Sequence, residues 1–331
     1  PDHPHIHVLN DGVAPPLRRT KLHIAGWRAV WRSSYDAVHA VDESVFFAMR
    51  LCRWRKIALV YDAFRCFSGK AGSGISGLMR FFPKHLQRLE AKVLEWADIV
   101  FSPCSVLTGD LHGMNRDAPV LQLEDVPVQP FFAQYNAVKS PFSETIDKPR
   151  GPVVLCSLLP GHALEISKLL LAVRKVVDVV PDMLFYLKGV PHGQAKKMAA
   201  NLDISDQCVF LPPNEPEAFL SALEIAEVTL MVPPGNGRYI HPQVYTLLYA
   251  SAPLMTISNA AYDEVLTEKT SVRVLPNAES IAEGLLRTIR EPLFSLAIAM
   301  EGQQLVAERH TCSSFKHKIR MAYHDLDKTA P

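Results

Sequence analysis

Short apolar runs alternate with helical patterns along most of this chain, and this alternation restricts the fold more than any other feature. In the second half the runs stand at 153–156, 184–188, 209–211, 228–232, 254–257 and 272–275, with helical patterns at 163–180, 194–202, 216–226, 260–266 and 278–290. Strands that alternate with helices form parallel sheets, because the chain crosses a face of the sheet between successive strands. The sequence therefore predicts an α/β fold with helices on both faces of parallel sheets.

The first half repeats this alternation, and a polar stretch separates the two halves. Apolar runs at 36–41, 56–61, 99–102 and 119–123 accompany helical patterns at 43–54 and 83–97. Residues 133–150 are polar, contain two prolines and lack periodicity, which is typical of a linker. We predict a first Rossmann-like domain over 1–132, the linker 133–150, a second Rossmann-like domain over 151–292 and terminal helices over 293–331. Because the chain begins with Pro1 rather than Met, we expect a fragment or processed form whose first domain is truncated at its start.

Composition limits the classes of function. The chain has 331 residues, of which 48% are apolar and 21% charged, as in soluble globular proteins. Its net charge of +1 argues against nucleic acid as the main partner. No apolar run approaches the ~20 residues of a membrane-spanning helix, and no signal peptide is visible. The six cysteines are spread singly, which predicts reduced thiols in a cytoplasmic protein, and no cluster of metal ligands is visible.

Positive charge is concentrated near the N-terminus. From Arg18 to Lys92 the chain has 15 Lys or Arg against 5 Asp or Glu residues. Residues 78–92 mix aromatic and basic side chains at helical spacing, which fits a solvated helix with an apolar core face. The same pattern fits a surface that meets an anionic membrane or an anionic acceptor. Residues 18–92 therefore leave open a peripheral contact with a membrane.

The stretch 228–253 has the features of an anion-binding loop. A strand at 228–232 is followed by two prolines, a loop that contains Gly237 and Arg238, and a helical pattern that runs to Ala252. A glycine loop between a strand and a helix presents backbone N–H groups and a helix N-terminus to an anion. We therefore predict an anion site at this loop.

Polar residues and a glycine stand where predicted strands end. We place His39 at the end of the first strand, Asp62 at the end of the second and Gly189 after the strand at 184–188. A His or Asp at the ligand-facing end of a parallel strand can act as a base or hold a hydroxyl. Alternatively, His39 is an ordinary structural histidine, and Asp62 is a carboxylate that pairs with another group within the fold. Gly189 either forms only a turn or lets the backbone approach a ligand closely.

Several sequence motifs are shared with a known family. They are LKG at 187–189, CVFLPP at 208–213, EIAEVTLMVPP at 224–234 and HPQVYTLLYASAP at 241–253, with YDAVHAV at 35–41, IALVYD at 57–62, EWADIVFSPCS at 95–105 and VPVQPFF at 126–132 in the first half. On these motifs the chain resembles the group-1 (family 4-like) glycosyltransferases of the GT-B fold. The segment at 309–326 is similar to the family's last helix.

This resemblance implies an architecture and a reaction. The fold would be two Rossmann-like domains whose parallel sheets face a central cleft, with terminal helices that cross back to the first domain. Such enzymes bind a nucleotide-sugar donor on the second domain and an acceptor, which can be a glycan, a lipid-linked sugar or another molecule, on the first. They transfer the sugar with retention of anomeric configuration. They usually need no metal, and the nucleotide-sugar is a co-substrate rather than a cofactor.

The residues at the family's donor-binding positions differ from the family pattern. Gln243 stands at the position of a lysine, Thr246 at that of the ribose-binding glutamate, and Arg238 at that of an earlier glutamate. Ser157 and His162 align with an arginine and a lysine. A charge-assisted hydrogen bond contributes about 1.5–3 kcal/mol, so the loss of two cations would weaken donor binding strongly. Arg238, or His162 when protonated, could supply a replacement charge.

Two hypotheses from different classes follow. The first is a glycosyltransferase in which His39 and Asp62 are the catalytic residues on the acceptor side. Its donor-binding residues would be Ser157, His162, Gly189, Gly237, Arg238, Gln243 and Thr246. The second is a GT-B-fold binding or partner subunit without transferase activity, which the missing cations favour. A sugar epimerase on the same two-domain fold is a third interpretation.

Overall fold

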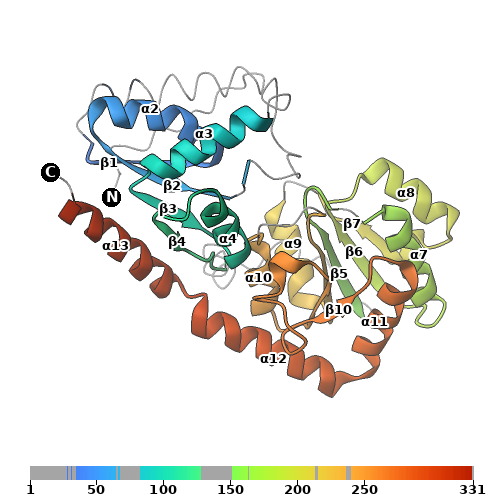
Figure 1. Cartoon of the computed structure of the whole chain (residues 1–331). Coiled ribbons are helices and arrows are strands. Elements are labelled where there is room, and N and C mark those ends of the chain that lie inside the picture. The colour runs from blue at the N-terminus through green and yellow to red at the C-terminus, as the bar shows by residue number, and fades with distance from the viewer. Residues whose placement is uncertain are drawn as a thin grey trace. The chain divides into compact units, whose positions relative to one another are not determined.

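The structure is a computed structural model that describes residues 28, 31, 35–64, 66–67, 83–127, 151–162, 164–212, 215–235 and 240–329. The chain divides into two compact units. The first comprises Pro1–Ser102, Leu107–Gln122 and Ala322–Pro331, and the second comprises Pro103–Val106 and Leu123–Met321. The predicted linker at 133–150 lies outside the described residues. Each unit contains its own parallel sheet (Figure 1).

A four-stranded sheet forms the first unit, in the order β1-β2-β3-β4. Its strands are β1 (Ala37–Val41), β2 (Ala58–Asp62), β3 (Ile99–Ser102) and β4 (Val120–Gln122), and the helices between them are α2 (Val45–Arg55), α3 (Pro83–Trp96) and α4 (Ser105–Met114). Strand β3 is buried along its whole length, whereas the edge strand β1 is buried only at Ala40. Helices α2 and α3 cover one face of this sheet (Figure 1).

A six-stranded sheet forms the second unit, in the order β10-β9-β8-β5-β6-β7. Its strands are β5 (Val153–Leu158), β6 (Leu184–Lys188), β7 (Cys208–Phe210), β8 (Val228–Val232), β9 (Leu254–Ile257) and β10 (Val272–Val274). The chain runs outward from β5 through β6 to β7 and then returns to β8, on the other side of β5. The strand order therefore reverses between β5 and β8. Open parallel sheets bind ligands at such a point, beyond the carboxyl ends of the strands.

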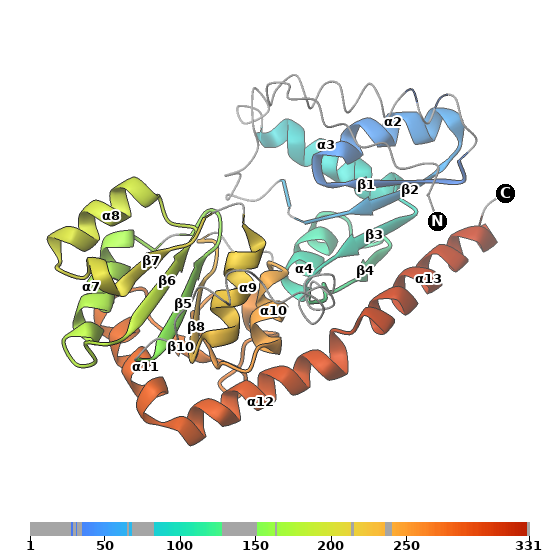
Figure 2. The ribbon, with the colours of Figure 1, turned by 180° about the vertical axis from the view of Figure 1, so that it is seen from behind.

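Helices cover both faces of the second sheet (Figure 2). Helices α7 (Ile166–Val177), α8 (His192–Asn201) and α11 (Ala278–Arg290) lie on one face, and α9 (Pro216–Ile225) and α10 (Gln243–Tyr249) lie on the other. Alternate strand residues, such as Cys156 and Leu230, pack with α7, α8 and α11 in a continuous apolar core. Because successive side chains of a strand point to opposite faces, Ser157 faces α9 and α10.

Most of the predicted elements are present. The predicted bounds of β3, β6, β8, β9 and α11 agree with the observed ones. Each of these strands is a short apolar run that ends next to a proline, a glycine or a polar residue. One helix, α4, was not predicted. The terminal helical region is two helices, α12 (Pro292–Arg309) and α13 (Cys312–Thr329), which are separated by His310 and Thr311.

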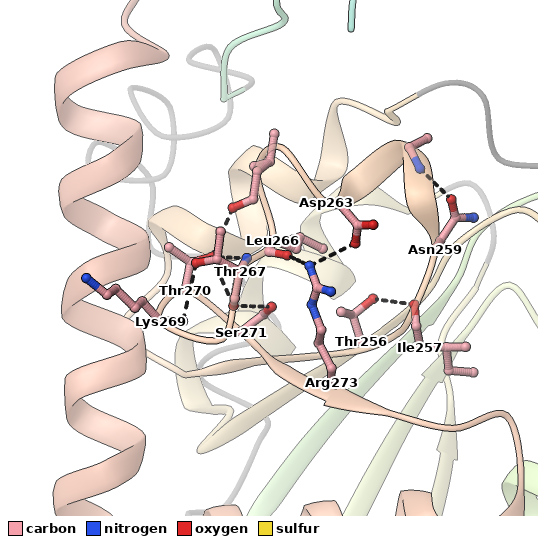
Figure 3. A network of polar contacts seen from close by, with 12 residues as sticks. Thr256, Ile257, Asn259, Asp263, Leu266, Thr267, Lys269, Thr270, Ser271 and Arg273 are labelled. Atoms are coloured by element: carbon pink, nitrogen blue, oxygen red, sulfur yellow. Dashed lines mark hydrogen bonds and ion pairs between the residues drawn. The ribbon is translucent and has the colours of Figure 1, made fainter. Parts of the chain in front are cut away.

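The segment 260–266 differs from the predicted helix, since only Ala260–Tyr262 forms a single 3-10 turn, η4. Side chains bind the backbone that a helix would use (Figure 3). The Arg273 guanidinium lies 2.8 Å from the Asp263 carboxylate and also donates to the Leu266 carbonyl. After the 3-10 turn the chain forms only turns, in which the N–H groups of Val265 and Leu266 both donate to the Tyr262 carbonyl, at 3.0 Å and 2.6 Å.

Helix α10 is shorter than the predicted pattern, which ran to Ala252. Its last carbonyl groups are bound from outside the helix. The side-chain amide of Gln303, in α12, donates to the carbonyls of Tyr249 at 3.3 Å and Ala250 at 3.1 Å. An external donor that satisfies the final carbonyls replaces the next helical turn, so the helix ends at Tyr249.

Candidate functional site

The candidate site lies in the second unit, at the carboxyl ends of β5, β6 and β8. The loops after β5 and β8 are joined there, because His162 and Pro234 form an antiparallel bridge. In addition, the Gly235 N–H donates to the Gly161 carbonyl at 3.0 Å. Asn259, whose side chain caps the η4 turn (Figure 3), donates from its amide to the Pro234 carbonyl at 3.0 Å. These bonds fix the backbone where the strand order reverses.

Strand register brings Ser157 and Lys188 together. They are direct partners in the ladder between β5 and β6, so both side chains point to the face covered by α9 and α10. Gln243, the first residue of α10, donates from its side-chain Nε2 to the Ser157 hydroxyl at 2.7 Å. Ser157 is 1% exposed, so this bond satisfies a buried hydroxyl. Two of the predicted donor-binding residues therefore touch each other across 86 positions of sequence.

A pocket of about 320 Å³ opens beside this contact. It is lined by Lys188 at the end of β6, by Pro216, Phe219 and Leu220 of α9, and by His241, Pro242, Gln243 and Thr246 at α10. The lining combines apolar side chains with an ammonium, an imidazole, an amide and a hydroxyl. The volume lies at the lower end of the range for small-molecule sites. The pocket suits a ligand that has an apolar body and an anionic or polar group.

Lys188 places its ammonium group against the apolar wall of the pocket. The Lys188 Nζ lies 3.9 Å from the centre of the Phe219 ring, which is a cation–π contact. Within the described part of the chain it forms no hydrogen bond and no ion pair. Burial lowers the pKa of Lys188, because removal from water disfavours the charged form.

His241 is held by contacts at the start of α10. Its backbone N–H donates to the Tyr262 hydroxyl at 3.0 Å, and its Nδ1 accepts from the Gln243 N–H at 3.2 Å. The proton of the neutral ring is therefore on Nε2. Burial, and after it the charge of Lys188, lowers the pKa of His241. An anion placed beside this ring would act in the opposite direction and favour its protonation.

Thr246, Gly189 and His162 occupy different positions around the pocket. Thr246 lines it and is 5% exposed. Gly189 follows Lys188 directly and has a φ of 82°, and a Cβ atom there would lie 2.1 Å from the Leu158 carbonyl oxygen. The imidazole of His162 is hydrogen-bonded through Nδ1 to the Leu164 carbonyl at 3.0 Å. Neither His162 nor Gly189 is among the residues that line the pocket.

The predicted anion-binding loop cannot be placed in this arrangement. Gly237 and Arg238 lie outside the described residues, and their roles stay predictions.

The two acceptor-side candidates come together in the first unit. His39 Nε2 lies 3.5 Å from an Asp62 carboxylate oxygen, and His39 Nδ1 lies 2.8 Å from the Tyr323 hydroxyl of α13. Burial and then the charge of Asp62 raise the pKa of Tyr323, so its hydroxyl keeps its proton in this hydrogen bond. Asp62 ends β2 as predicted, but His39 does not end a strand, because β1 continues to Val41. Both ring nitrogens of His39 have partners, and a catalytic role for the pair stays a prediction.

Lys188, His241 and the apolar wall of α9 were not among the predicted site residues. The signal for Lys188 was present in the sequence, since it is a single cation at the end of the apolar strand LFYLK. His241 precedes the two residues that were aligned with family positions, so its place at the start of the same helix was also a signal. Phe219 gave none, because an aromatic residue within an apolar helix is typical of a core.

Other features bear on the remaining predictions. The described residues contain no group of three or more His, Cys, Asp and Glu side chains that could hold a metal ion. No helix in the described part of the chain has the length and apolarity to cross a membrane. The six cysteines are free thiols, and four of them are buried. Much of the basic region 18–92 lies outside the described residues, so its contact with a membrane stays a prediction.

Comparisons with known proteins agree with this architecture at the level of the fold. No protein-family model and no curated protein matches the sequence. The α,α-trehalose-phosphate synthase (UDP-forming) from Burkholderia vietnamiensis aligns with a TM-score of 0.70 at 13% identity, over 94% of this chain and 76% of that one. Anabaena HepE, solved in complex with UDP and glucose, aligns with a TM-score of 0.68 at 12% identity, over 92% and 81% of the two chains. A UDP-N-acetylglucosamine 2-epimerase aligns with a TM-score of 0.58 at 12% identity, over 89% and 74%.

The chain therefore has the GT-B fold, as its sequence motifs predicted. Identities of this size show the shared fold alone. The similar structures include synthases and an epimerase, so the fold is compatible with more than one reaction on a nucleotide-sugar.

Proposed function

We propose that this chain is a glycosyltransferase that takes a sugar from a nucleotide-sugar donor bound in the pocket of the second unit. The observation that carries the proposal is the position of the pocket at the carboxyl ends of the central strands β5 and β6. Open α/β sheets bind their ligands at this place. The combination of an apolar wall with Lys188, His241, Gln243 and Thr246 suits a nucleotide, which has an apolar base and an anionic diphosphate.

The similar structures support the choice of donor class. One is a UDP-forming synthase, and another holds UDP and glucose. We extend this chemistry to the present chain as part of the proposal, and UDP-sugars are accordingly the first donors to test. GDP- and ADP-sugars follow, since no residue described in the pocket selects between the bases.

The proposed reaction moves the sugar with retention of anomeric configuration. The bond between the anomeric carbon and the diphosphate oxygen breaks, and its electron pair leaves on the nucleoside diphosphate. An acceptor hydroxyl oxygen forms the new bond to the anomeric carbon on the same face of the sugar, and its proton passes to a base. Gln243 and Thr246 would hydrogen-bond the ribose or the phosphates, with Ser157, His162, Gly189, Gly237 and Arg238 around the diphosphate. His39 and Asp62 would bind the acceptor hydroxyl or receive its proton.

A panel of nucleotide-sugars tests this proposal. The melting temperature of the protein should rise with at least one UDP-, GDP- or ADP-sugar at millimolar concentration, because a ligand that binds the folded state stabilises it. The rise should be reduced in the variant Gln243→Ala. The control is Gln304→Ala, since this exposed glutamine bonds only Glu308 in α12. No rise with any donor would contradict the proposal, and chromatography of the products would separate transfer from hydrolysis and from epimerisation.

A second candidate function is a binding or partner subunit without transferase activity. The observation that favours it is that two aligned cation positions hold Ser157 and Gln243, whose side chains bond each other. A nucleotide-sugar that binds but is never consumed, with a range of glycan and lipid-linked acceptors, would favour this candidate. Consumption of the donor with release of the nucleoside diphosphate would exclude it.

A peripheral membrane contact through residues 18–92 is a separate part of the proposal, which the excess of Lys and Arg supports. Co-sedimentation with vesicles that contain anionic lipid should exceed that with neutral vesicles, and it should fall as salt is added. Equal co-sedimentation with both kinds of vesicle would remove this contact.

A further inference from the structure

Lys188 is in an unusual position for a lysine. It ends a strand whose three preceding residues are buried, and its side chain turns into the pocket beside α9. Surface lysines keep their ammonium group in water or next to a carboxylate. In the described part of the chain the ammonium of Lys188 has neither a hydrogen bond nor an ion pair, and it lies over the face of Phe219. The charge is therefore partly removed from water without an anionic partner.

The cation–π contact does not offset this loss by itself. A lysine over a phenylalanine ring gains only a modest attraction. Desolvation of an ammonium group costs more than this unless a counter-charge is present. The lowered pKa of Lys188 is the expected sign of such a cost. A partly buried cation that faces an open pocket is a site prepared for an anion.

Neighbouring groups complete a receptor for that anion. His241 stands across the pocket, close enough for the charge of Lys188 to lower its pKa. Its Nδ1 accepts a hydrogen bond from the Gln243 N–H, so the proton of the neutral ring lies on Nε2. Gln243 adds an amide that is held in place by Ser157. These donors come from β6 and from the start of α10, and none of them is a carboxylate.

The apolar side chains in the pocket lining indicate the rest of the ligand. Pro216, Phe219 and Leu220 offer an apolar surface that a free phosphate or sulfate ion would leave in contact with water. A phosphorylated nucleoside uses both kinds of surface, since its base covers apolar side chains and its phosphate meets the cation. The hydroxyl of Thr246 also lines the pocket and suits the ribose.

We infer that Lys188, assisted by His241, holds the anionic phosphates of the donor nucleotide and so supplies from β6 the positive charge that is absent at Ser157 and Gln243. This inference rests on the proposed function, because it assumes that the ligand of the pocket is a nucleotide. Lys188 aligns with none of the positions at which the group-1 glycosyltransferases carry their phosphate-binding cations. The donor would then bind at the same place in the fold as in that family, but the positive charge beside its phosphates would come from β6.

The test compares charged and uncharged ligands in variants of one lysine. Lys188→Met keeps the length and the apolar stem but removes the charge, and Lys188→Arg keeps the charge. The matched control is Lys196→Met, because Lys196 also lies over an aromatic ring, 5.9 Å from the centre of Phe210, but does not line the pocket. Affinities of the full chain for UDP and for uridine are measured by calorimetry, with GDP and guanosine and with ADP and adenosine as further pairs.

We expect Lys188→Met to weaken binding of the diphosphate by about 10- to 150-fold and to leave the nucleoside unchanged, since one charge-assisted bond is lost. Lys188→Arg should restore most of the affinity, and Lys196→Met should match the unmodified protein. In the absence of ligand Lys188→Met should melt at the same or a higher temperature, because it removes a desolvated charge. A lysine that served only to hold Phe219 would instead lower the melting temperature when replaced.

Two outcomes would overturn the inference: unchanged diphosphate affinity in Lys188→Met, or an equal loss for diphosphate and nucleoside. Its failure can be separated from failure of the proposed function. If sugar transfer occurs but Lys188→Met binds the diphosphate normally, the inference is wrong and the proposed function stands. If the diphosphate binds through Lys188 but no donor is ever consumed, the inference stands and the transferase function is wrong.

Discussion

Gly189→Ala is the substitution for which the structure gives the largest effect at the candidate site. Gly189 adopts a φ of 82°, where an L-residue costs about 1–2 kcal/mol. The new Cβ atom would also lie 2.1 Å from the Leu158 carbonyl oxygen, which is backbone and cannot rotate away. Relief requires the ends of β5 and β6 to separate, and overpacking of this kind costs about 1–3 kcal/mol. The two contributions sum to about 2–5 kcal/mol of lost stability.

The second unit offers a matched control for the first of these contributions. Gly161 has a φ of 79°, but nothing lies within 4 Å of the position of its Cβ atom. Gly161→Ala should therefore cost only the backbone strain of about 1–2 kcal/mol. Both alanines restrict the unfolded chain equally, so this effect cancels in the comparison. The difference between the two variants, about 1–3 kcal/mol, measures the contact between Gly189 and Leu158.

Urea unfolding followed by far-ultraviolet circular dichroism measures the difference. With an m value of about 2 kcal/mol/M, the midpoint of Gly189→Ala should lie about 0.5–1.5 M below that of Gly161→Ala. All four tryptophans precede residue 103, so their fluorescence reports the first unit and helps to assign the loss. Because Lys188 moves with its neighbour, Gly189→Ala should also weaken nucleotide binding. Equal midpoints for the two variants would refute the close approach of β5 and β6.

Three further predictions concern acid stability, thiols and the ribose contact. Burial lowers the pKa of His241 and His310, so the unfolded chain binds protons more tightly than the folded chain below about pH 6.5. The free energy of unfolding should then fall as the pH drops through that value, by at most about 1.4 kcal/mol per pH unit for each histidine. In the variant His310→Phe, the urea midpoint should depend less steeply on pH. A thiol reagent should modify the half-buried Cys66 and Cys312 before the four buried cysteines. Burial raises the pKa of two of these four, Cys52 to about 11 and Cys208 to about 12. Equal rates of modification for all six thiols would contradict the burial. Thr246→Val, which keeps the shape of the side chain, should weaken nucleotide binding by about 0.5–1.5 kcal/mol in calorimetry with an unchanged melting temperature, and unaltered affinity would remove the hydroxyl from the site.

Local sequence patterns predicted the sheets well for a definite physical reason. Strands such as β8 and β9 are buried on both faces, so in the sequence they are largely apolar runs that are bounded by prolines or polar residues. Helix α4 was missed because its sequence contains two glycines, which have low helix propensity. Burial of Leu107 and Leu111, one turn apart, stabilises this helix instead. Propensity alone could not reveal that packing.

The candidate site was predicted only in part, and the missing part depends on contacts distant in sequence. Family resemblance selected Ser157, Gln243 and Thr246, and the first two are in contact. The sequence shows Lys188 only as the last residue of a strand, because its role depends on the register with Ser157 and on the placement of Phe219. Neither can be read from periodicity.

The acceptor-side prediction shows the same limit. The partnership of His39 with Tyr323 joins residues 284 positions apart, which no local pattern shows. Sequence reasoning could identify His39 as a polar residue on a strand and Asp62 as the end of the next one. It could not show that the Tyr323 hydroxyl of α13 would form a hydrogen bond with Nδ1 of the His39 imidazole.

A crystal structure of this chain grown with UDP would show directly where the nucleotide binds. We expect electron density for the nucleotide in the pocket between α9 and α10, with the base against the apolar side chains of α9 and a phosphate oxygen within hydrogen-bonding distance of Lys188 Nζ. A nucleotide bound elsewhere on the protein, or a pocket that stays empty at a UDP concentration that saturates binding in solution, would contradict it.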